Sequence, residues 1–267
     1  MRNEMHARTG ISLQMLQARA AAWLPPRRTC TEPYRHELKY RISYAEKAAL
    51  ELRMRPLLQP DPHAGDGGYF IRSLYFEDYW HSAYEEKDAG VLLRKKYRIR
   101  IYNCSDASIK LERKKKFGSW ICKEDAVLTR AELAQILAGE YGFLLHSPQP
   151  LCREFYYECT ANLLRPRVIV DYEREPWVME QGTVRITFDQ RIRAAVDGLD
   201  LFDLNLPTLP VLEPDVLVME VKFTEFLPQI VRTLLPPKAQ ELTAVSKYVL
   251  CCDRTAYLHG FAYGNAL

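Results

Sequence analysis

The stretch KKYRIRIYNCSDASIKLERKKKFGSWICKEDAVL, residues 95–128, decides the fold. It reads as three strands joined by short turns of hairpin character, at residues 95–102, 108–115 and 120–128. Successive strand residues point to opposite faces of a sheet, so residues two apart share a face. Arg98 and Arg100 therefore lie on the face opposite to Ile99. The stretch predicts an antiparallel sheet with one ionic and one apolar face.

Five predicted strands carry this alternation, with the following residues on their ionic faces: Glu37, Lys39 and Arg41; Arg98 and Arg100; Lys110, Glu112 and Lys114; Arg185, Thr187 and Asp189; Glu220 and Lys222. A sheet with helices on one side and water on the other would explain any single strand. A solvated face, however, usually mixes in Ser, Thr, Asn and Gln, whereas here long cations recur with a few acids between them. Closing the sheet into a barrel removes its edges and turns the ionic face inward. We therefore expect an α+β fold, an antiparallel closed β-barrel tunnel with a polar, cation-lined lumen and helices packed outside.

The rest of the chain reads as one globular unit. The 267 residues are 48% hydrophobic and 27% charged, and no apolar run approaches the ~18 residues of a membrane helix. Ser43 followed by Glu46, and Thr129 followed by Glu132, have the spacing of capping boxes that start helices. We expect a flexible N-terminal tail at residues 1–32, one domain at 33–256 and a C-terminal tail at 257–267.

A lumen crowded with Lys and Arg has a chemical consequence. Like charges within a Debye length of ~8 Å repel one another, and burial adds a desolvation cost, so the lumen must stay wet or hold a polyanion. Arg pairs oxyanions bidentately and Lys acts as a mobile point charge, which makes phosphate the natural guest. Several charged hydrogen bonds of ~1.5–3 kcal/mol each would outweigh the repulsion. The acids between the cations fit a divalent metal that bridges carboxylate and phosphate oxygens.

Other functional classes have weaker support. The balance of 37 Lys and Arg against 34 Asp and Glu gives a net charge of only +3, which does not favour a nucleic-acid partner. The basic runs at residues 94–96 and 113–116 have few stacking aromatic residues beside them. The absence of a GxxxxGK[ST] loop argues against a P-loop enzyme. Seven cysteines and six histidines at irregular spacings favour neither a zinc site nor a disulfide framework, and fit a reducing, cytoplasmic setting.

Seven motifs between Tyr34 and Asp253 resemble, in order and spacing, the VTC (vacuolar transporter chaperone) domain: RHELKY at 35–40, YRIR at 97–100, KLERK at 110–114, YER at 172–174, VRITFD at 184–189, MEVK at 219–222 and SKY at 246–248. This family is a polyphosphate polymerase domain of the triphosphate tunnel metalloenzyme (CYTH-like) superfamily. The resemblance implies a transferase that binds ATP or another nucleoside triphosphate with Mn²⁺ or Mg²⁺ and moves the γ-phosphate onto a polyphosphate chain. A membrane-protein partner stays open, because the sequence shows no segment for one.

The resemblance also implies roles for individual residues. It implies that Arg98, Arg100, Lys110, Lys114, Arg185 and Lys247 act on the reacting phosphates. It implies further substrate contacts from Lys39, Lys123, Arg174 and Lys222. Glu220 is implied as a metal ligand, with Glu112 and Glu37 as helpers. Arg174 lies an odd number of residues from Arg167, so sharing its face requires a β-bulge or a strand end.

One departure from the superfamily pattern bears on the reaction. Tunnel triphosphatases usually open with Glu-x-Glu-x-Lys, and here Arg35 occupies the first of these positions. One carboxylate fewer and one cation more favour the polymerase branch. A triphosphatase on the same scaffold and a non-catalytic polyphosphate-binding domain remain the alternatives.

Overall fold

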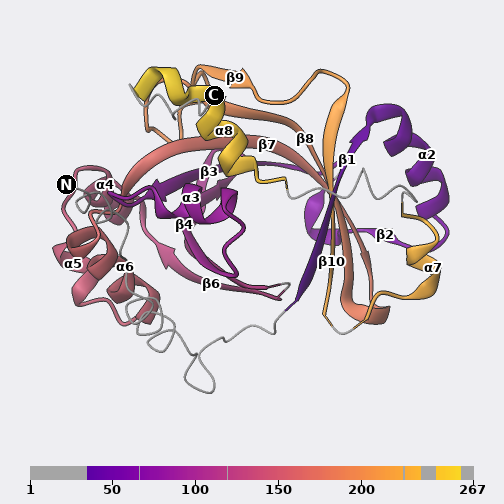
Figure 1. Ribbon diagram of the computed structural model, residues 1–267, viewed down its shortest axis with the longest axis horizontal. Helices are drawn as coiled ribbons and strands as arrows, with labels where there is room; N and C mark the ends of the chain where they lie inside the picture. The colour runs from indigo at the N-terminus through magenta and orange to yellow at the C-terminus, as the bar shows by residue number, and fades with distance from the viewer. Residues whose placement is uncertain (1–34, 66, 119, 225, 236–244, 260–267) are drawn as a thin grey trace, which may run out of the picture. The chain divides into compact units, whose positions relative to one another are not determined.

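The computed structural model describes residues 35–65, 67–118, 120–224, 226–235 and 245–259 (Figure 1). The strands are β1 (His36–Ser43), β2 (Gln59–Pro60), β3 (Tyr69–Glu77), β4 (Leu93–Tyr102), β5 (Ser105–Phe117), β6 (Trp120–Leu128), β7 (Arg165–Met179), β8 (Val184–Ala195), β9 (Thr208–Pro210) and β10 (Val216–Phe223). The α-helices are α2 (Tyr44–Met54), α3 (Ser82–Asp88), α4 (Arg130–Leu137), α5 (Gly142–Leu145), α6 (Pro150–Ala161), α7 (Gln229–Arg232) and α8 (Lys247–Thr255). Three short 3₁₀ helices are η1 (Pro62–Ala64), η2 (Gln181–Thr183) and η3 (Ala256–His259). The tail predicted for residues 1–32 lies outside the described residues.

The strands form one ten-stranded antiparallel sheet in the order β1-β10-β8-β7-β3-β4-β5-β6, with β2 paired to β7 and β9 paired to β8. β4, β5 and β6, the strands of the deciding stretch, pair with one another in sequence. Between the two ends of the order, β1 and β6, the described residues show one isolated bridge, in which Arg35 and Ile121 exchange backbone hydrogen bonds of 3.1 Å. The large antiparallel sheet of the predicted α+β fold is confirmed, whereas a closed barrel is not.

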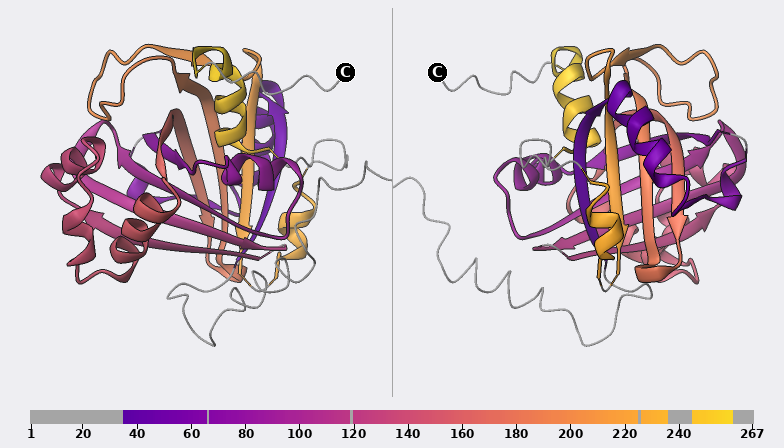
Figure 2. Two further views of the ribbon diagram at one scale, coloured as in Figure 1. Left: turned by 60° about the vertical axis from the view of Figure 1, so that its left-hand side comes forward. Right: turned by 90° about the vertical axis from the view of Figure 1, so that its right-hand side faces the viewer.

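The two ends of the sheet nevertheless lie close together. The Lys114 Nζ on β5 lies 2.7 Å from the Glu37 Oε2 on β1, although these strands are not neighbours in the sheet order. The ring of His36 at the start of β1 packs against that of Trp120 on β6, with centroids 4.3 Å apart. Figure 2 shows the same strands from two further sides. Because twisted strands coil the sheet, its ionic faces point toward a common interior.

Helices cover the sheet in three hydrophobic clusters, the first two on its apolar face. The third lies on the other face, because its Val218 shares a side of β10 with Glu220. Here α8 packs on the inner face and lends Lys247 and Tyr248 to the cavity described below, so the expectation that the helices pack outside is wrong for α8. Ile99 of β4 and Phe155 of α6 belong to the first cluster, and Ile42 of β1 and Met54 of α2 belong to the second. The third contains the adjacent Cys251 and Cys252 of α8, which are free and buried and serve as small apolar residues. Cys122 is disulfide-bonded, which the irregular cysteine spacing did not predict. Among the described helices, none has the length and apolarity needed to cross a membrane.

Local sequence signals explain where several elements begin. The Oγ of Ser43 accepts the backbone N–H of Glu46 at 3.2 Å and the Glu46 carboxylate accepts the N–H of Ser43, which confirms the predicted capping box of α2. Thr129 and Glu132 form the same arrangement at α4. The predicted bulge in β7 is also present: consecutive residues of β3 pair with Val168 and Pro166, so Arg167 is the extra residue.

Candidate functional site

The ionic strand faces line one cavity of about 630 Å³. Its lining contains fourteen Lys and Arg side chains, two carboxylates (Glu37 and Glu220) and five tyrosines. Eleven of the thirteen residues expected at the site contribute to it: Glu37, Lys39, Arg98, Arg100, Lys114, Lys123, Arg174, Arg185, Glu220, Lys222 and Lys247. Such an excess of cations over acids predicts a ligand that carries several negative charges.

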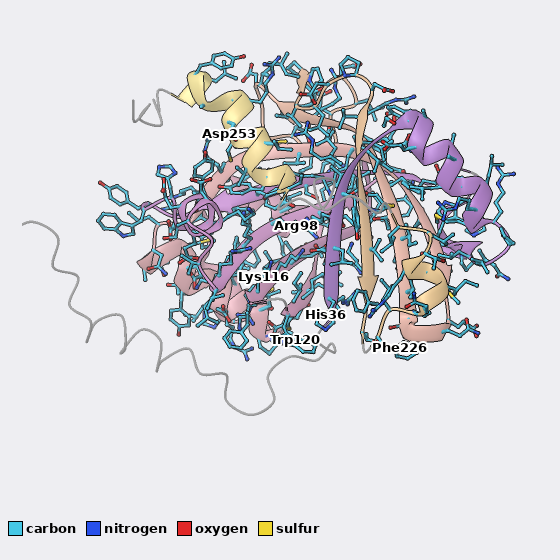
Figure 3. The ribbon with its side chains drawn as sticks, turned by 45° about the vertical axis from the view of Figure 1, so that its right-hand side comes forward. His36, Arg98, Lys116, Trp120, Phe226 and Asp253 are labelled. Carbon is cyan, nitrogen blue, oxygen red and sulfur yellow. The ribbon has the colours of Figure 1, made fainter. Side chains whose placement is uncertain are left out.

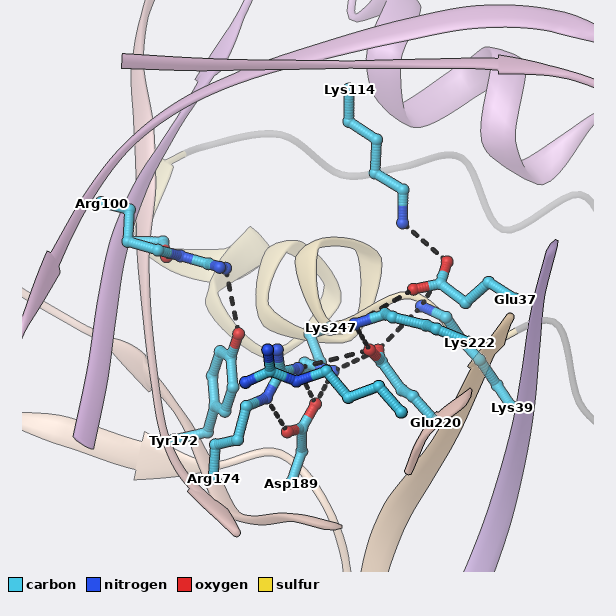
Figure 4. A network of polar contacts seen from close by, with 12 residues as sticks. Glu37, Lys39, Arg100, Lys114, Tyr172, Arg174, Asp189, Glu220, Lys222 and Lys247 are labelled. Atoms are coloured by element: carbon cyan, nitrogen blue, oxygen red, sulfur yellow. Dashed lines mark hydrogen bonds and ion pairs between the residues drawn. The ribbon is translucent and has the colours of Figure 1, made fainter. Parts of the chain in front are cut away.

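Glu220 of β10 is the centre of the charge network drawn in Figure 4. Its carboxylate lies 2.8 Å from the ammonium groups of Lys222 and Lys247, 3.2 Å from that of Lys39 and 3.3 Å from the guanidinium of Arg174. Burial alone would raise the pKa of Glu220, but these four cations outweigh it and hold the pKa well below its usual range. Glu220 is therefore a buried, ionised carboxylate.

Glu37 of β1 is a second carboxylate joined to the same lysines. It lies 2.7 Å from Lys114, 3.7 Å from Lys222 and 4.0 Å from Lys39. Burial would again raise its pKa, and the Coulomb attraction of Lys114 and Lys39 lowers it well below the usual value. Because Lys39 and Lys222 contact both carboxylates, Glu37 and Glu220 form one connected pair.

Asp189 of β8 fixes the inner end of this network. It accepts two hydrogen bonds from the Arg174 guanidinium, at 2.6 and 2.7 Å, and also contacts the Lys247 ammonium group. Burial would lower the pKa of Lys247, but Asp189 and Glu220 raise it above its usual value. Lys247 stands in the first turn of α8, which the Ser246 side chain caps, so the helix start places this cation.

A separate group of contacts lies on β4 to β6. Arg98 donates to the Glu112 carboxylate at 2.7 Å and to the hydroxyl of Tyr75 at 2.8 Å, and Lys123 lies 3.2 Å from Glu112. Arg100 donates to the Tyr172 hydroxyl at 3.0 Å. Glu112 is 1% exposed beneath these cations and does not line the cavity. It therefore supports the cations of this wall from behind.

Two further expected residues lie toward the periphery. Lys110 does not line the cavity; its ammonium group is 3.6 Å from Asp125, and its side chain is one-third exposed. Arg185 does line the cavity, and it contacts the Asp61 carboxylate at 2.8 Å and the Tyr69 hydroxyl at 3.2 Å. Strand alternation gives Lys110 the correct face but not its position along the channel.

The chemistry of the donor set can be tested against a divalent metal. Among the described ranges, no group of three or more His, Cys, Asp and Glu side chains is gathered as metal ligands. The connected carboxylates Glu37 and Glu220 are instead surrounded by lysines. Mg²⁺ is commonly held by one or two carboxylates together with substrate phosphates, and Mn²⁺ also suits oxygen ligands. The pair fits a hard cation that binds together with a phosphate ligand.

Sequence reasoning missed several cavity residues. Arg94 and Lys96 continue the alternation of β4 toward its start, and Lys116 continues that of β5 toward its end, so the period-two pattern held the signal. Lys87 enters from α3, and no periodicity in the strands could have found it. Asp189 was on the predicted ionic face without an assigned role.

The sequence matches one family of known proteins. Residues 34–256 match the family model of the VTC domain. A search of curated proteins found no significant match. Among solved structures, a "putative adenylate cyclase" from Bacillus halodurans is 14% identical with a TM-score of 0.46, covering 78% of this chain and 95% of that one. A protein from Pyrococcus horikoshii OT3 is 12% identical with a TM-score of 0.43, covering 83% and 99%. Neither likeness is close enough to carry a conclusion about function.

Proposed function

The chain belongs to the VTC domain family, and from this premise we propose that it is a metal-dependent polyphosphate polymerase. In this proposal it transfers the γ-phosphate of a nucleoside triphosphate such as ATP to a polyphosphate chain. The observation that supports it most is the composition of the cavity wall, with fourteen cations and two carboxylates. Because Arg and Lys neutralise phosphate oxygens in phosphoryl transfer, this wall suits both the donor triphosphate and a polyanionic acceptor.

The proposed roles of the individual cations follow from their contacts and from their positions in the cavity. Arg98 and Arg100 on β4 and Arg185 on β8 would hold the β- and γ-phosphates, since guanidinium groups match phosphate oxygens bidentately. Further contacts would come from the remaining cations of the network, Lys39, Lys114, Lys123, Arg174, Lys222 and Lys247. Lys110 receives no phosphate contact in this proposal, because it lies off the cavity. The neighbouring carboxylates keep the cations apart and oriented before the ligand arrives.

The acceptor requires no general base. A terminal phosphate of a polyphosphate chain is already anionic at neutral pH, so the cavity has to position it and screen its charge. Glu220, with Glu37, would hold a divalent metal, which supplies charge neutralisation on the phosphate oxygens when it is bound. Glu112 would act on the reaction only through the orientation of Arg98 and Lys123.

Arg35 favours the polymerase over the triphosphatase. It lines the cavity, and it occupies the position at which tunnel triphosphatases usually have a glutamate. A cation there adds affinity for a second polyanion and removes one metal-binding carboxylate. Hydrolysis needs only water as the acceptor, so extra cationic surface would bring it no advantage.

We expect the purified chain, given ATP and Mn²⁺, to form polymer that increases when a short polyphosphate primer is added. The primer supplies the anionic acceptor and removes the slow first transfer. Polymer is resolved by gel electrophoresis and free phosphate is measured in the same reaction. Free phosphate as the sole product would instead identify a triphosphatase, and tight ATP binding without turnover would identify a binding domain.

Triphosphate binding at pH 8 is expected to take up protons. Burial, with Lys39 adding to it against the attraction of Glu37, lowers the pKa of Lys114 to about 8. A bound phosphate raises that pKa, so affinity should fall as pH rises through about 8, where Lys114 loses its proton. Calorimetric titration with tripolyphosphate in two buffers of different ionisation heat measures the uptake. Lys114→Arg, which stays charged, should bind with less uptake; equal uptake would exclude Lys114 as the source.

A further inference from the structure

The cavity wall formed by β4 and β5 has two electrically different parts. In the strand register, Arg98 pairs with Glu112, so this position holds one cation and one acid. The next two pairs on the same face, Lys96 with Lys114 and Arg94 with Lys116, contain cations only. Like charges placed directly opposite each other destabilise an antiparallel pair. This end of the wall therefore carries a repulsion, which the contact of Lys114 with Glu37 relieves for only one of its four cations.

The two parts differ in whether carboxylates neutralise their cations. Each expected cation that lines the cavity has a carboxylate within 4.0 Å. Lys39, for example, has Glu220, and Arg185 has Asp61. Four other lining residues have no carboxylate within that distance in the part of the chain that the structure describes: Lys87, Arg94, Lys96 and Lys116. We call these four the uncompensated cluster. Arg94 donates to a backbone carbonyl, that of Val91, at 2.9 Å.

Lys96 is the clearest member of the uncompensated cluster. Its Nζ is buried, has no hydrogen-bond partner among the described residues, and lies 4.3 Å from the centroid of the Tyr248 ring of α8. Burial lowers the pKa of Lys96 to about 7, with Glu77 of β3 and Cys252 of α8 opposing and Arg94 and Lys39 adding to the effect. A buried ammonium group without a partner is costly unless a ligand supplies one.

The pKa values of Lys116 and Lys87 are lowered in the same way. Burial lowers the pKa of Lys116, and the charges of Arg94, Lys39 and Lys87 lower it further against the more distant attraction of Glu37. Burial and the charge of Arg94 likewise lower the pKa of Lys87. The charge of Arg94 thus lowers the pKa of all three lysines, although they come from α3, β4 and β5, so the four groups share one neighbourhood. Figure 3 labels Arg98, which belongs to the part of the wall with paired acids, and Lys116, which belongs to the uncompensated cluster.

We propose that the uncompensated cluster is a second anion-binding subsite, which takes the phosphate groups of a linear inorganic polyphosphate beyond the three that the Glu220 and Glu112 networks hold. This proposal rests on the proposed function of the cavity. Arg94, Lys96 and Arg98 follow one strand face at steps of about 6.6 Å, so a chain bound at Arg98 can continue along them. The nucleoside of ATP is uncharged and would leave the four cations without a partner.

The test compares two ligands on one protein. The full chain is titrated with tripolyphosphate and with a longer linear polyphosphate at fixed, near-physiological salt. We expect the longer chain to bind at least about tenfold more tightly, since two or more charged contacts are added. The double variant Arg94→Gln/Lys116→Gln should lose most of this gain and keep nearly all of its affinity for tripolyphosphate.

A matched control lies one residue away on the same strands. Lys95 and Lys115 face each other in the register, as Arg94 and Lys116 do, but on the opposite side of the sheet, where they contact Glu158 and Glu124. Lys95→Gln/Lys115→Gln removes the same net charge and should keep the chain-length gain. Loss of the gain in this control would overturn the proposal in favour of unspecific attraction.

The remaining outcomes are distinct. A retained gain in Arg94→Gln/Lys116→Gln would overturn the second subsite and leave the proposed function standing. An equal loss for both ligands would also overturn it, because one common site would then bind everything. Failure of the unaltered protein to bind tripolyphosphate would contradict the proposed function itself.

Lys96→Met provides a second measurement that folding defects cannot imitate. Methionine has a similar volume and lacks the buried charge, so the melting temperature without ligand should rise while the affinity for the longer polyphosphate falls. A merely structural lysine would give a lower melting temperature. That result would count against a ligand-binding role for Lys96.

Discussion

Arg98→Ala is expected to reduce polymer synthesis by about 100- to 1,000-fold, the loss typical when one preorganised donor to a developing charge is removed. Arg98 is placed for this role by Tyr75 and Glu112, whose contacts fix its guanidinium at 2.8 and 2.7 Å. Arg98→Lys should recover only part of the rate, because an ammonium group cannot pair two oxygens in a plane. Rates are measured as polymer formed from ATP with a primer.

The Arg98→Ala protein should remain folded. Glu112 keeps Lys123 at 3.2 Å and Arg100 at 3.9 Å, so its buried carboxylate is not left without a cation. Arg41→Ala serves as the control, because Arg41 pairs with the exposed Glu213 and lies outside the cavity lining. Thermal unfolding of both variants checks the fold. Normal synthesis by folded Arg98→Ala would refute the assignment of this cavity as the reaction site.

Glu220→Gln is expected to affect activity and stability together. Four cations surround this carboxylate, and breaking a buried charge network by removing one partner typically costs about 3–5 kcal/mol. The free energy of unfolding should fall by an amount of that order, and metal-dependent synthesis should be largely lost. Chemical denaturation with and without tripolyphosphate measures the first effect.

The ligand response separates charge balance from a packing defect. Tripolyphosphate supplies negative charge that the amide of the Glu220→Gln variant lacks, so it should stabilise this variant more than the unaltered protein. Glu213→Gln is the control, since the Glu213 side chain is 68% exposed. Equal stabilisation of all three proteins would show that Glu220 does not balance the cavity charge. Unchanged metal-dependent synthesis would exclude it as the metal-binding carboxylate.

Much of the fold follows from local patterns. Alternation of charged and apolar residues located β4, β5 and β6, and it placed Glu220 and Lys222 on one strand face, as β10 (Val216–Phe223) shows. Reading such patterns failed where a proline restricts the backbone conformation of its neighbour. The sequence from about residue 224 to 235 also reads as one helix, but the structure forms only the single turn α7 there. A proline disfavours helix in the residue before it, and Pro228 therefore precedes the helix.

The candidate site was predictable in its composition and not in its pairing. The two-residue alternation placed Lys114 and Glu37 on ionic strand faces. Their contact, however, joins two strands that are not neighbours in the sheet order. Such contacts depend on the curvature of the sheet and on how far each strand is shifted along its neighbour. The same reason explains Lys110, which has the correct face and lies off the cavity.

The placement of the first two hydrophobic clusters on the face opposite to the cavity has a further consequence. Much of the apolar burial that stabilises the chain lies in these two clusters, between strands and helices, whereas the cavity wall is dominated by charged groups and tyrosines. Selection can therefore change the inner wall without dismantling the scaffold, provided that a buried acid and the cations it balances change together. On this view, the ratio of acids to cations along the channel is the variable by which such a protein changes the anion it accepts.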